Sequence, residues 1–216
     1  MPRLLTRCGC SLVGTVIAIT AATMSVAAVP SPANSTLPLC MALCPLGDMP
    51  FTVVVRDLAA NPIAGSTVVL DFSACPGAFL CHQPGGTPPP YVLDPTARTI
   101  RAVTGAAGNV TIPAHVGGTG PPGSVHVFAD GVLLKNYALA SPDQNGNGVC
   151  VSIVDTDDAI FATKLGTSDP TADFDCDGDV DALDQQIFFN HHSQFCDGFV
   201  DPARQSTWGS VKLHYR

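Results

Sequence analysis

The sequence predicts two modules in one chain: an all-β sandwich followed by a small α-helical module. Two observations predict this division. Short runs of β-branched residues, separated by Gly, Pro and Asn, fill residues 51–140. Thirteen of the eighteen aspartates then lie between residues 143 and 201, and the 216 residues contain no Glu. Since Glu and Lys are strong helix formers while Asp favours caps, turns and metal loops, an all-helical bundle is not expected.

The net charge of −8 comes from eighteen acidic and ten basic residues, and Lys occurs only three times. Nucleic-acid binding needs clustered Lys or Arg to neutralise phosphates. We therefore expect no nucleic-acid partner.

Residues 1–28 have the pattern of a secretory signal peptide. Arg3 and Arg7 precede an uncharged apolar run that ends in Val26-Ala27-Ala28, small residues of the kind that a signal peptidase reads. The run is shorter than the roughly 20 residues of a membrane-spanning helix, and no later stretch is a better candidate. We expect a protein without a membrane span that is secreted, either extracellular or at the cell surface.

Seven cysteines follow the predicted signal, and outside the cell they are expected to form disulfides. Cys75 and Cys81 flank a short Pro/Gly loop and are the best local pair, while Cys150 and Cys176 are candidate partners of Cys196. The sequence does not determine the connectivity. Because seven is odd, one thiol should be free or pair between chains. Zinc is a weaker alternative, since no C-x-x-C pair occurs and the only adjacent histidines are His191 and His192.

Six short strands are predicted in the first module. Asp130-Gly131 between two of them is a strong signal for a type I′ hairpin. Strands at this spacing favour a β-sandwich, and residues 29–50 are expected to be a linker or its first strand. The predicted strands are residues 51–57, 66–72, 97–103, 108–113, 124–128 and 132–134.

Two segments give this module a family resemblance. They are Val55-Arg-Asp-Leu-Ala-Ala-Asn-Pro-Ile-Ala-Gly-Ser-Thr-Val68 and Thr104-Gly-Ala-Ala-Gly-Asn-Val-Thr-Ile112. Residues 51–140 thereby resemble the bacterial immunoglobulin-like domains of the invasin/intimin kind. The resemblance implies an immunoglobulin-like sandwich that acts as a spacer, stalk or adhesion module, and it implies no chemistry.

Residues 173–184 carry the pattern of a twelve-residue calcium loop. Acids occupy loop positions 1, 3, 5, 9 and 12, Gly178 occupies position 6 and the apolar Val180 position 8. Alternate carboxylates can wrap a hard cation, Asp179 can offer its backbone carbonyl, and Asp184 can close the site from the first turn of a helix. The predicted ligands are Asp173, Asp175, Asp177, Asp179, Asp181 and Asp184.

An earlier segment begins in the same way, with Asp143, Asn145, Asn147 and Gly148. Its closing position would then be Val154, which is not an acid. Aligning Asp157 with Asp184 requires three extra residues around positions 150–152, and Asp155 or Asp158 could close the loop instead. The candidate ligands of this loop are Asp143, Asn145, Asn147, Val149, Asp155, Asp157 and Asp158.

A helix is expected after the second loop, with Ile187, Phe188 and Phe195 on the same face as His191 or His192. One calcium ion is expected and the pattern allows a second. A module this small has a thin core, so calcium should contribute to its folding free energy.

Two such loop-and-helix units in residues 143–196 resemble a type I dockerin, an EF-hand-like calcium module. The nearest alternative, a thrombospondin-type calcium repeat, does not predict the apolar helical face. The resemblance implies docking onto a cohesin module, commonly within extracellular complexes that degrade polysaccharides. In cellulosomal dockerins a Ser-Thr-like pair at loop positions 10 and 11 contacts cohesin; here these positions hold Ala182 and Leu183.

Nothing in the sequence indicates an enzyme, because no Gly-x-Ser-x-Gly motif or facing pair of carboxylates is evident outside the calcium loops. The expected function is therefore a non-catalytic docking or surface-assembly module, with a cohesin-like or surface protein as partner. The alternative is a carbohydrate-binding accessory or adhesion protein that uses its sandwich, with purely structural calcium. Only Tyr91 and Tyr137 are candidate polar aromatics for that use. The tail, residues 197–216, either lies across the domain or is a sorting signal.

Overall fold

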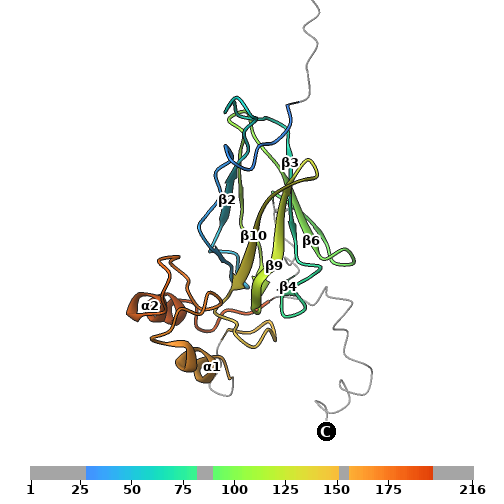
Figure 1. The fold of residues 1–216 in the computed structure, drawn as a ribbon. Coiled ribbons are helices and arrows are strands. Elements are labelled where there is room, and N and C mark those ends of the chain that lie inside the picture. The colour runs from blue at the N-terminus through green and yellow to red at the C-terminus, as the bar shows by residue number, and fades with distance from the viewer. Residues whose placement is uncertain (1–27, 82–89, 151–155, 197–216) are drawn as a thin grey trace, which may run out of the picture.

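The computed structural model describes residues 28–81, 90–150 and 156–196. Within them the chain forms ten strands and two short helices, and the helices lie together at one end of the β structure (Figure 1). The structure is thus mostly β with a small helical part. Almost all of the predicted signal peptide and the whole tail lie outside the described residues.

The larger sheet has six strands in the order β1-β10-β9-β3-β6-β5. All neighbours are antiparallel except β1, which runs parallel to β10 with Met41 opposite Leu139. Asp130 and Gly131 join β9 to β10 with φ of 46° and 82°, so the predicted hairpin is present. The strands are β1 (Met41–Ala42), β3 (Thr67–Asp71), β5 (Val92–Asp94), β6 (Thr99–Val103), β9 (Gly120–Ala129) and β10 (Val132–Ala140).

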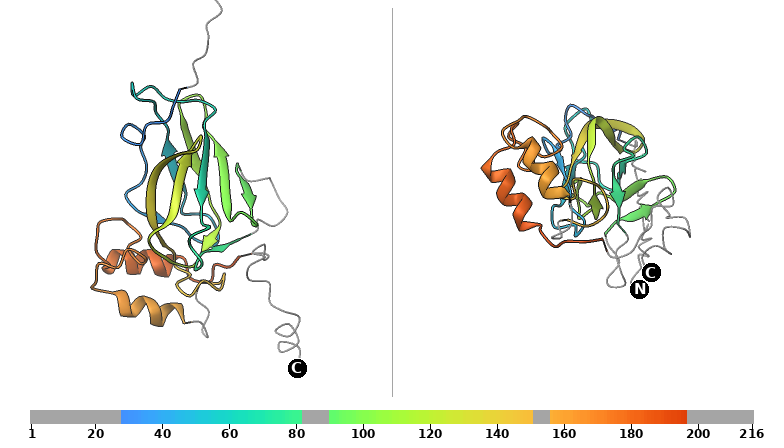
Figure 2. Two further views of the ribbon diagram at one scale, coloured as in Figure 1. Left: turned by 45° about the vertical axis from the view of Figure 1, so that its right-hand side comes forward. Right: turned by 90° about the horizontal axis from the view of Figure 1, so that it is seen from below.

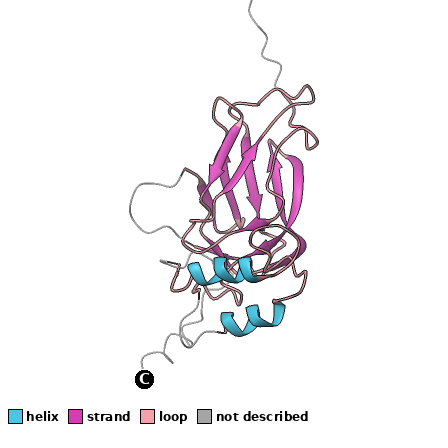
Figure 3. Ribbon diagram, turned by 90° about the vertical axis from the view of Figure 1, so that its left-hand side faces the viewer, coloured by secondary structure: helices cyan, strands magenta, loops and turns pink. Residues whose placement is uncertain are grey.

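Two strand pairs complete the β structure. β2 (Phe51–Val54) pairs with β7 (Asn109–Ile112), and β4 (Phe79–Leu80) pairs with β8 (Val116–Gly117). Side chains from these pairs and from the six-stranded sheet share one buried apolar cluster, in which the ring of Phe51 meets Tyr137 edge-on at 5.5 Å. The two layers form a sandwich that stands above the helices (Figures 2 and 3).

All six predicted strands are present, with bounds that differ by up to several residues. β1 lies within residues 29–50, for which a first strand was one of the two expectations. β4, β5 and β8 were not predicted, because two or three residues are too few to show an alternating pattern. The segment before β2 contributes to the sandwich: Thr36 bridges to Val54, and Met41 and Leu43 are fully buried.

The helical module consists of α1 (Asp157–Lys164) and α2 (Ala182–Asn190). Phe161 and Phe188 stack with their ring centroids 4.5 Å apart, and Phe174 adds a third, nearly parallel ring. Ala42 and Met49, from the segment around β1, pack against this small aromatic core. The core is therefore shared between the module and the base of the sandwich.

Two disulfides connect the sandwich to the helical module: Cys40–Cys176 and Cys81–Cys196. The expected Cys75–Cys81 pair is wrong, and so is the expectation that Cys196 meets Cys150 or Cys176. Nearness in sequence was misleading, because each disulfide joins a cysteine of the sandwich to one of the helical module: Cys40 to Cys176, and Cys81 to Cys196. More than one thiol is left over: Cys44 and Cys75 are free and buried, and Cys150 is buried as well.

No helix in the described ranges is both long and apolar enough to span a membrane.

Candidate metal centre

The second loop, residues 173–184, is closed by its own first and last carboxylates. Asp173 accepts hydrogen bonds from the backbone N–H of Cys176 at 2.7 Å and of Gly178 at 3.1 Å. Asp184 is fully buried and accepts from the N–H of Phe174 at 2.6 Å and of Asp181 at 2.9 Å. These bonds hold both ends of the loop around one point.

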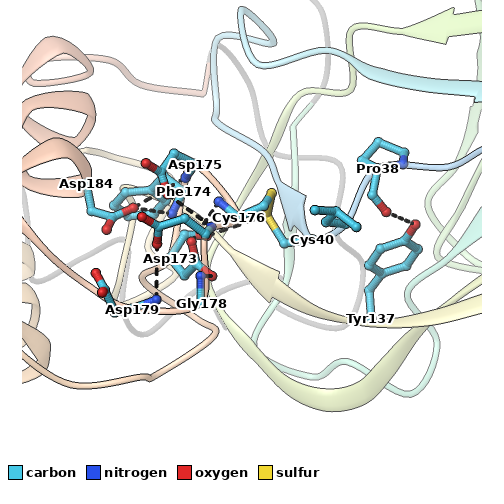
Figure 4. Close-up of a disulfide and its surroundings, with 12 residues drawn as sticks. Pro38, Cys40, Tyr137, Asp173, Phe174, Asp175, Cys176, Gly178, Asp179 and Asp184 are labelled. Atoms are coloured by element: carbon cyan, nitrogen blue, oxygen red, sulfur yellow. Dashed lines mark hydrogen bonds between the residues drawn. A yellow bond between two sulfur atoms is a disulfide. The ribbon is translucent and has the colours of Figure 1, made fainter.

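Acids between these ends also accept hydrogen bonds from backbone N–H groups of the loop. Asp175 accepts from the N–H of Asp177, and Asp177 from the N–H of Asp179. The oxygens of Asp173, Asp175 and Asp177 can lie within 4.8 Å of one another, as can those of Asp179, Asp181 and Asp184. Figure 4 shows Asp173, Asp175 and Asp184 together on one side of the Cys40–Cys176 disulfide.

The carboxylates of the second loop repel one another. Asp177 is the largest of the causes that raise the pKa of Asp179. Burial, and then the charges of Asp184, Asp177 and Asp173, raise the pKa of Asp175. A divalent cation among these oxygens would remove this repulsion.

Asp181 also has a local structural role. It is the N-cap of α2, and its side chain accepts a hydrogen bond from the N–H of Leu183 at 2.7 Å. The side chain of Asp184 in turn accepts a hydrogen bond from the N–H of Asp181. This reciprocal capping box fixes the first turn of the helix, and with it the closing carboxylate of the loop.

The first loop repeats this backbone arrangement. Asp143 accepts from the N–H of Asn147 at 3.1 Å and of Gly148 at 2.9 Å, and Asn147 accepts from the N–H of Val149. Positions 4 and 6 have positive φ in both loops: 67° and 85° at Gly146 and Gly148, and 70° and 103° at Cys176 and Gly178.

Asp157 is the closing residue of the first loop. It is fully buried and accepts a hydrogen bond from the backbone N–H of Asn145, at loop position 3, at 2.9 Å. In the second loop Asp184 accepts in the same way from the N–H of Asp175, also at position 3, at 3.3 Å. Asp158 points elsewhere: one of its oxygens lies 3.4 Å from Nε2 of His192. Asp155 lies outside the described residues.

Asp143 and Asp157 form a pair of buried carboxyl groups. Burial and then the charge of Asp157 raise the pKa of Asp143 to about 7, against the opposing effect of the N–H bonds from the loop. Two buried like charges are costly unless a cation or a proton compensates them. The first loop can therefore be neutralised by either.

The two loops are related by reciprocal pairing that the sequence did not predict. Val180, at position 8 of the second loop, exchanges backbone hydrogen bonds with Gly166 and Thr167, just after α1. Cys150, at position 8 of the first, exchanges them with Ser193 and Gln194, just after α2. Each loop is thus braced by the chain that leaves the other helix, which makes the two units one structure.

The predicted helical face is correct only in part. Phe188 is buried and Ile187 packs against the aromatic core. Phe195 does not join them: α2 ends at Asn190, the chain turns at Ser193 with φ of 66°, and Phe195 is 55% exposed.

No protein-family model, no curated protein and no solved structure matches this chain. The candidate site is therefore judged on its geometry and chemistry.

A second group of metal-ligating side chains, which sequence reasoning missed, lies between the two modules. The Cys44 thiol donates to Asp48 at 2.6 Å, and Nε2 of His191 lies 3.5 Å from the same carboxylate oxygen. Burial and the adjacent Asp48 raise the pKa of Cys44 to about 12. Such a thiol is not an activated nucleophile, so this Cys-Asp-His group does not have the character of a catalytic triad.

Proposed function

We propose that this chain is a secreted, non-catalytic calcium-binding protein whose helical module serves as a docking or surface-assembly element. One observation carries the proposal: two loops repeat the same closure, in which the first and last acids accept backbone N–H groups and further oxygens line the loop between them. The twelve residues of the second loop and the fifteen of the first both place oxygens and a glycine as a calcium loop does, with an acid at each end.

Calcium is the cation that best fits these donors. Among the described residues, the candidate side-chain ligands of both loops offer carboxylate and amide oxygens, which suit hard cations rather than zinc or copper. Carboxylates lining the second loop outnumber those of the first, so the second is proposed as the tighter site.

Docking is supported by two exposed apolar side chains of α2. Leu183 and Phe189 are each 50% exposed, and Leu183 directly precedes the closing acid Asp184. Calcium that orders Asp184 would therefore also order an apolar surface beside it. A cohesin-like protein or another surface component with a complementary apolar patch is the proposed partner.

A second candidate function keeps calcium in a purely structural role, with the sandwich binding polysaccharide or acting in adhesion. The two disulfides and the shared aromatic core favour structural calcium, because they fix the helical module to the sandwich. Polysaccharide binding finds less support, since Tyr91 and Tyr137 are both buried and offer no exposed platform.

Native mass spectrometry of protein lacking residues 1–28, before and after chelation, tests calcium binding. We expect two calcium ions, lost together with helical circular dichroism. One ion would show that the first loop binds none. No ion, with circular dichroism unchanged by chelator, would overturn the proposal.

Docking is tested by titrating a type I cohesin onto calcium-loaded protein and onto the double variant Leu183→Ser/Phe189→Ser. Both side chains are half exposed, so stability should change by no more than about 0.5 kcal/mol while cohesin binding is lost. If the unmodified protein does not bind cohesin in calcium, the cohesin partner is ruled out and structural calcium is favoured.

A further inference from the structure

We infer that Cys44, Asp48 and His191 form a second metal site, specific for zinc or a similar transition metal, at the seam between the sandwich and the helical module. One ligand atom from each can lie within 4.8 Å of the other two. The site is separate from both calcium loops and shares no residue with them.

The ligands come from two distant segments. Cys44 and Asp48 lie between β1 and β2, in a turn where Gly47 adopts φ of 75° and its N–H donates to the carbonyl of Cys44. His191 is the C-cap of α2. An ion at this point would bind the base of the sandwich to the end of the second calcium-loop helix.

The hydrogen bonding of His191 prepares it as a ligand. Nδ1 lies 2.7 Å from the carbonyl oxygen of Ile187, which can only accept, so Nδ1 carries a proton. In the neutral ring, Nε2 then presents its lone pair toward Asp48 at 3.5 Å. Two acceptors face each other there, and either a proton on Nε2 or a cation between them resolves the conflict.

The donor set indicates which cation. A thiol sulfur, an imidazole nitrogen and a carboxylate oxygen match the ligands of zinc, whereas calcium takes oxygen alone. Zinc ligands at about 2.0–2.3 Å from the ion lie roughly 3.5 Å from one another in a tetrahedron. The His191–Asp48 separation already meets this value, and the Cys44 sulfur has to move outward from Asp48.

Gln194 provides a second, independent indication. This side chain is only 9% exposed, and its Nε2 donates to the other oxygen of Asp48 at 2.9 Å. Its Oε1 is buried and accepts no hydrogen bond from the described part of the chain. Buried acceptors are rarely left without a partner. A zinc-bound water in the fourth position, or the ion itself, would supply one.

The test uses the full chain lacking residues 1–28, saturated with calcium and titrated with Co²⁺ as a spectroscopic substitute for zinc. We expect one Co²⁺ per chain with a thiolate-to-metal charge-transfer band, and displacement of that band by one equivalent of Zn²⁺. Absence of the charge-transfer band in the unmodified protein would by itself overturn the proposal.

Matched variants locate the site. Cys44→Ser should abolish the band, and His191→Ala should weaken Co²⁺ binding at least tenfold. Cys75→Ser removes another buried free thiol, in the sandwich core, and should leave the band unchanged. A band that survives Cys44→Ser, or that is lost with Cys75→Ser, would overturn the assignment. Counting calcium in the same samples keeps this result independent of the calcium proposal.

Discussion

The two acidic loops have similar backbone conformations but differ in the number and placement of their charged side chains. The second loop lines its turn with carboxylates of which several are exposed, whereas the first replaces two of them with Asn145 and Asn147 and buries the rest. The first and last acids are buried in both loops, Asp143 and Asp157 in the first and Asp173 and Asp184 in the second. The second loop differs in its further carboxylates, such as the half-buried Asp175 and the exposed Asp179.

The two loops would therefore need a cation for different reasons. In the second loop the requirement comes from the number of charges, which no single proton can neutralise. In the first it comes from burial, and one proton on Asp143 satisfies it. We therefore expect the second loop to remain poorly ordered without calcium, and the first to tolerate calcium removal better at low pH.

The largest effect is expected from Asp184→Ala, which removes the closing carboxylate of the second loop. At calcium a thousandfold above the dissociation constant, loss of that ion costs about 4 kcal/mol of unfolding free energy. Urea unfolding in calcium measures the loss. Asp158→Ala, which removes an exposed acid from α1, is the control and should cost about 0.5 kcal/mol or less. Equal effects from the two variants would contradict the assigned closure.

Removal of the disulfides distinguishes the loops further. Replacing either pair with serines should cost about 2–4 kcal/mol, because each closes a long segment of the unfolded chain. Only Cys40→Ser/Cys176→Ser should also weaken calcium binding to the second loop, since Cys176 occupies its fourth position. Isothermal titration calorimetry, with Cys81→Ser/Cys196→Ser as the matched variant, checks this. A similar loss of affinity in both variants would show that the disulfides act only on overall stability.

Asp157→Asn is expected to have opposite effects with and without calcium. The variant should lose the ion of the first loop, because its closing carboxylate is gone. In chelator the same change removes one of two buried like charges, so the calcium-free protein should become more stable than its parent. Thermal unfolding in both conditions tests the reversal of sign. Destabilisation in chelator would mean that repulsion between the two buried carboxylates does not destabilise the calcium-free protein.

The smallest effect is a pH dependence of the calcium-free protein. The pKa of Asp143 is raised to about 7 in the folded state from an ordinary value near 4, so between these values the folded protein holds the extra proton. Its stabilising contribution is present at low pH and is lost as pH rises through about 7. Asp143→Asn should flatten the slope, and excess calcium should do the same. An unchanged slope in Asp143→Asn would assign it to another group.

The sequence predicted what is local. The second loop could be found because its ligands alternate within twelve residues, and the hairpin because Asp130-Gly131 determines its own turn. The insertion in the first loop left three candidates for closure. Of the two that the structure describes, Asp157 accepts from the N–H of Asn145, whereas Asp158 lies beside His192.

What could not be predicted depends on distant contacts. Cys40 and Cys176, or Asp48 and His191, become neighbours only because the module folds back onto the base of the sandwich. β1 has two residues and takes its place in the sheet through a parallel partner near the other end of the sandwich sequence. Composition and periodicity contain no information about such pairings.

The parallel pairing of β1 with β10 determines the order in which the protein can mature. Met41 is synthesised early, but its partner Leu139 and the cysteine that fixes its segment, Cys176, follow much later. The edge of the sheet thus stays open until β10 has emerged, and the disulfide that fixes the segment of β1 forms only after residue 176. A chain that crosses a membrane in the unfolded state meets both oxidant and calcium only after that crossing. For the secreted protein proposed above, the last steps of folding would then follow export.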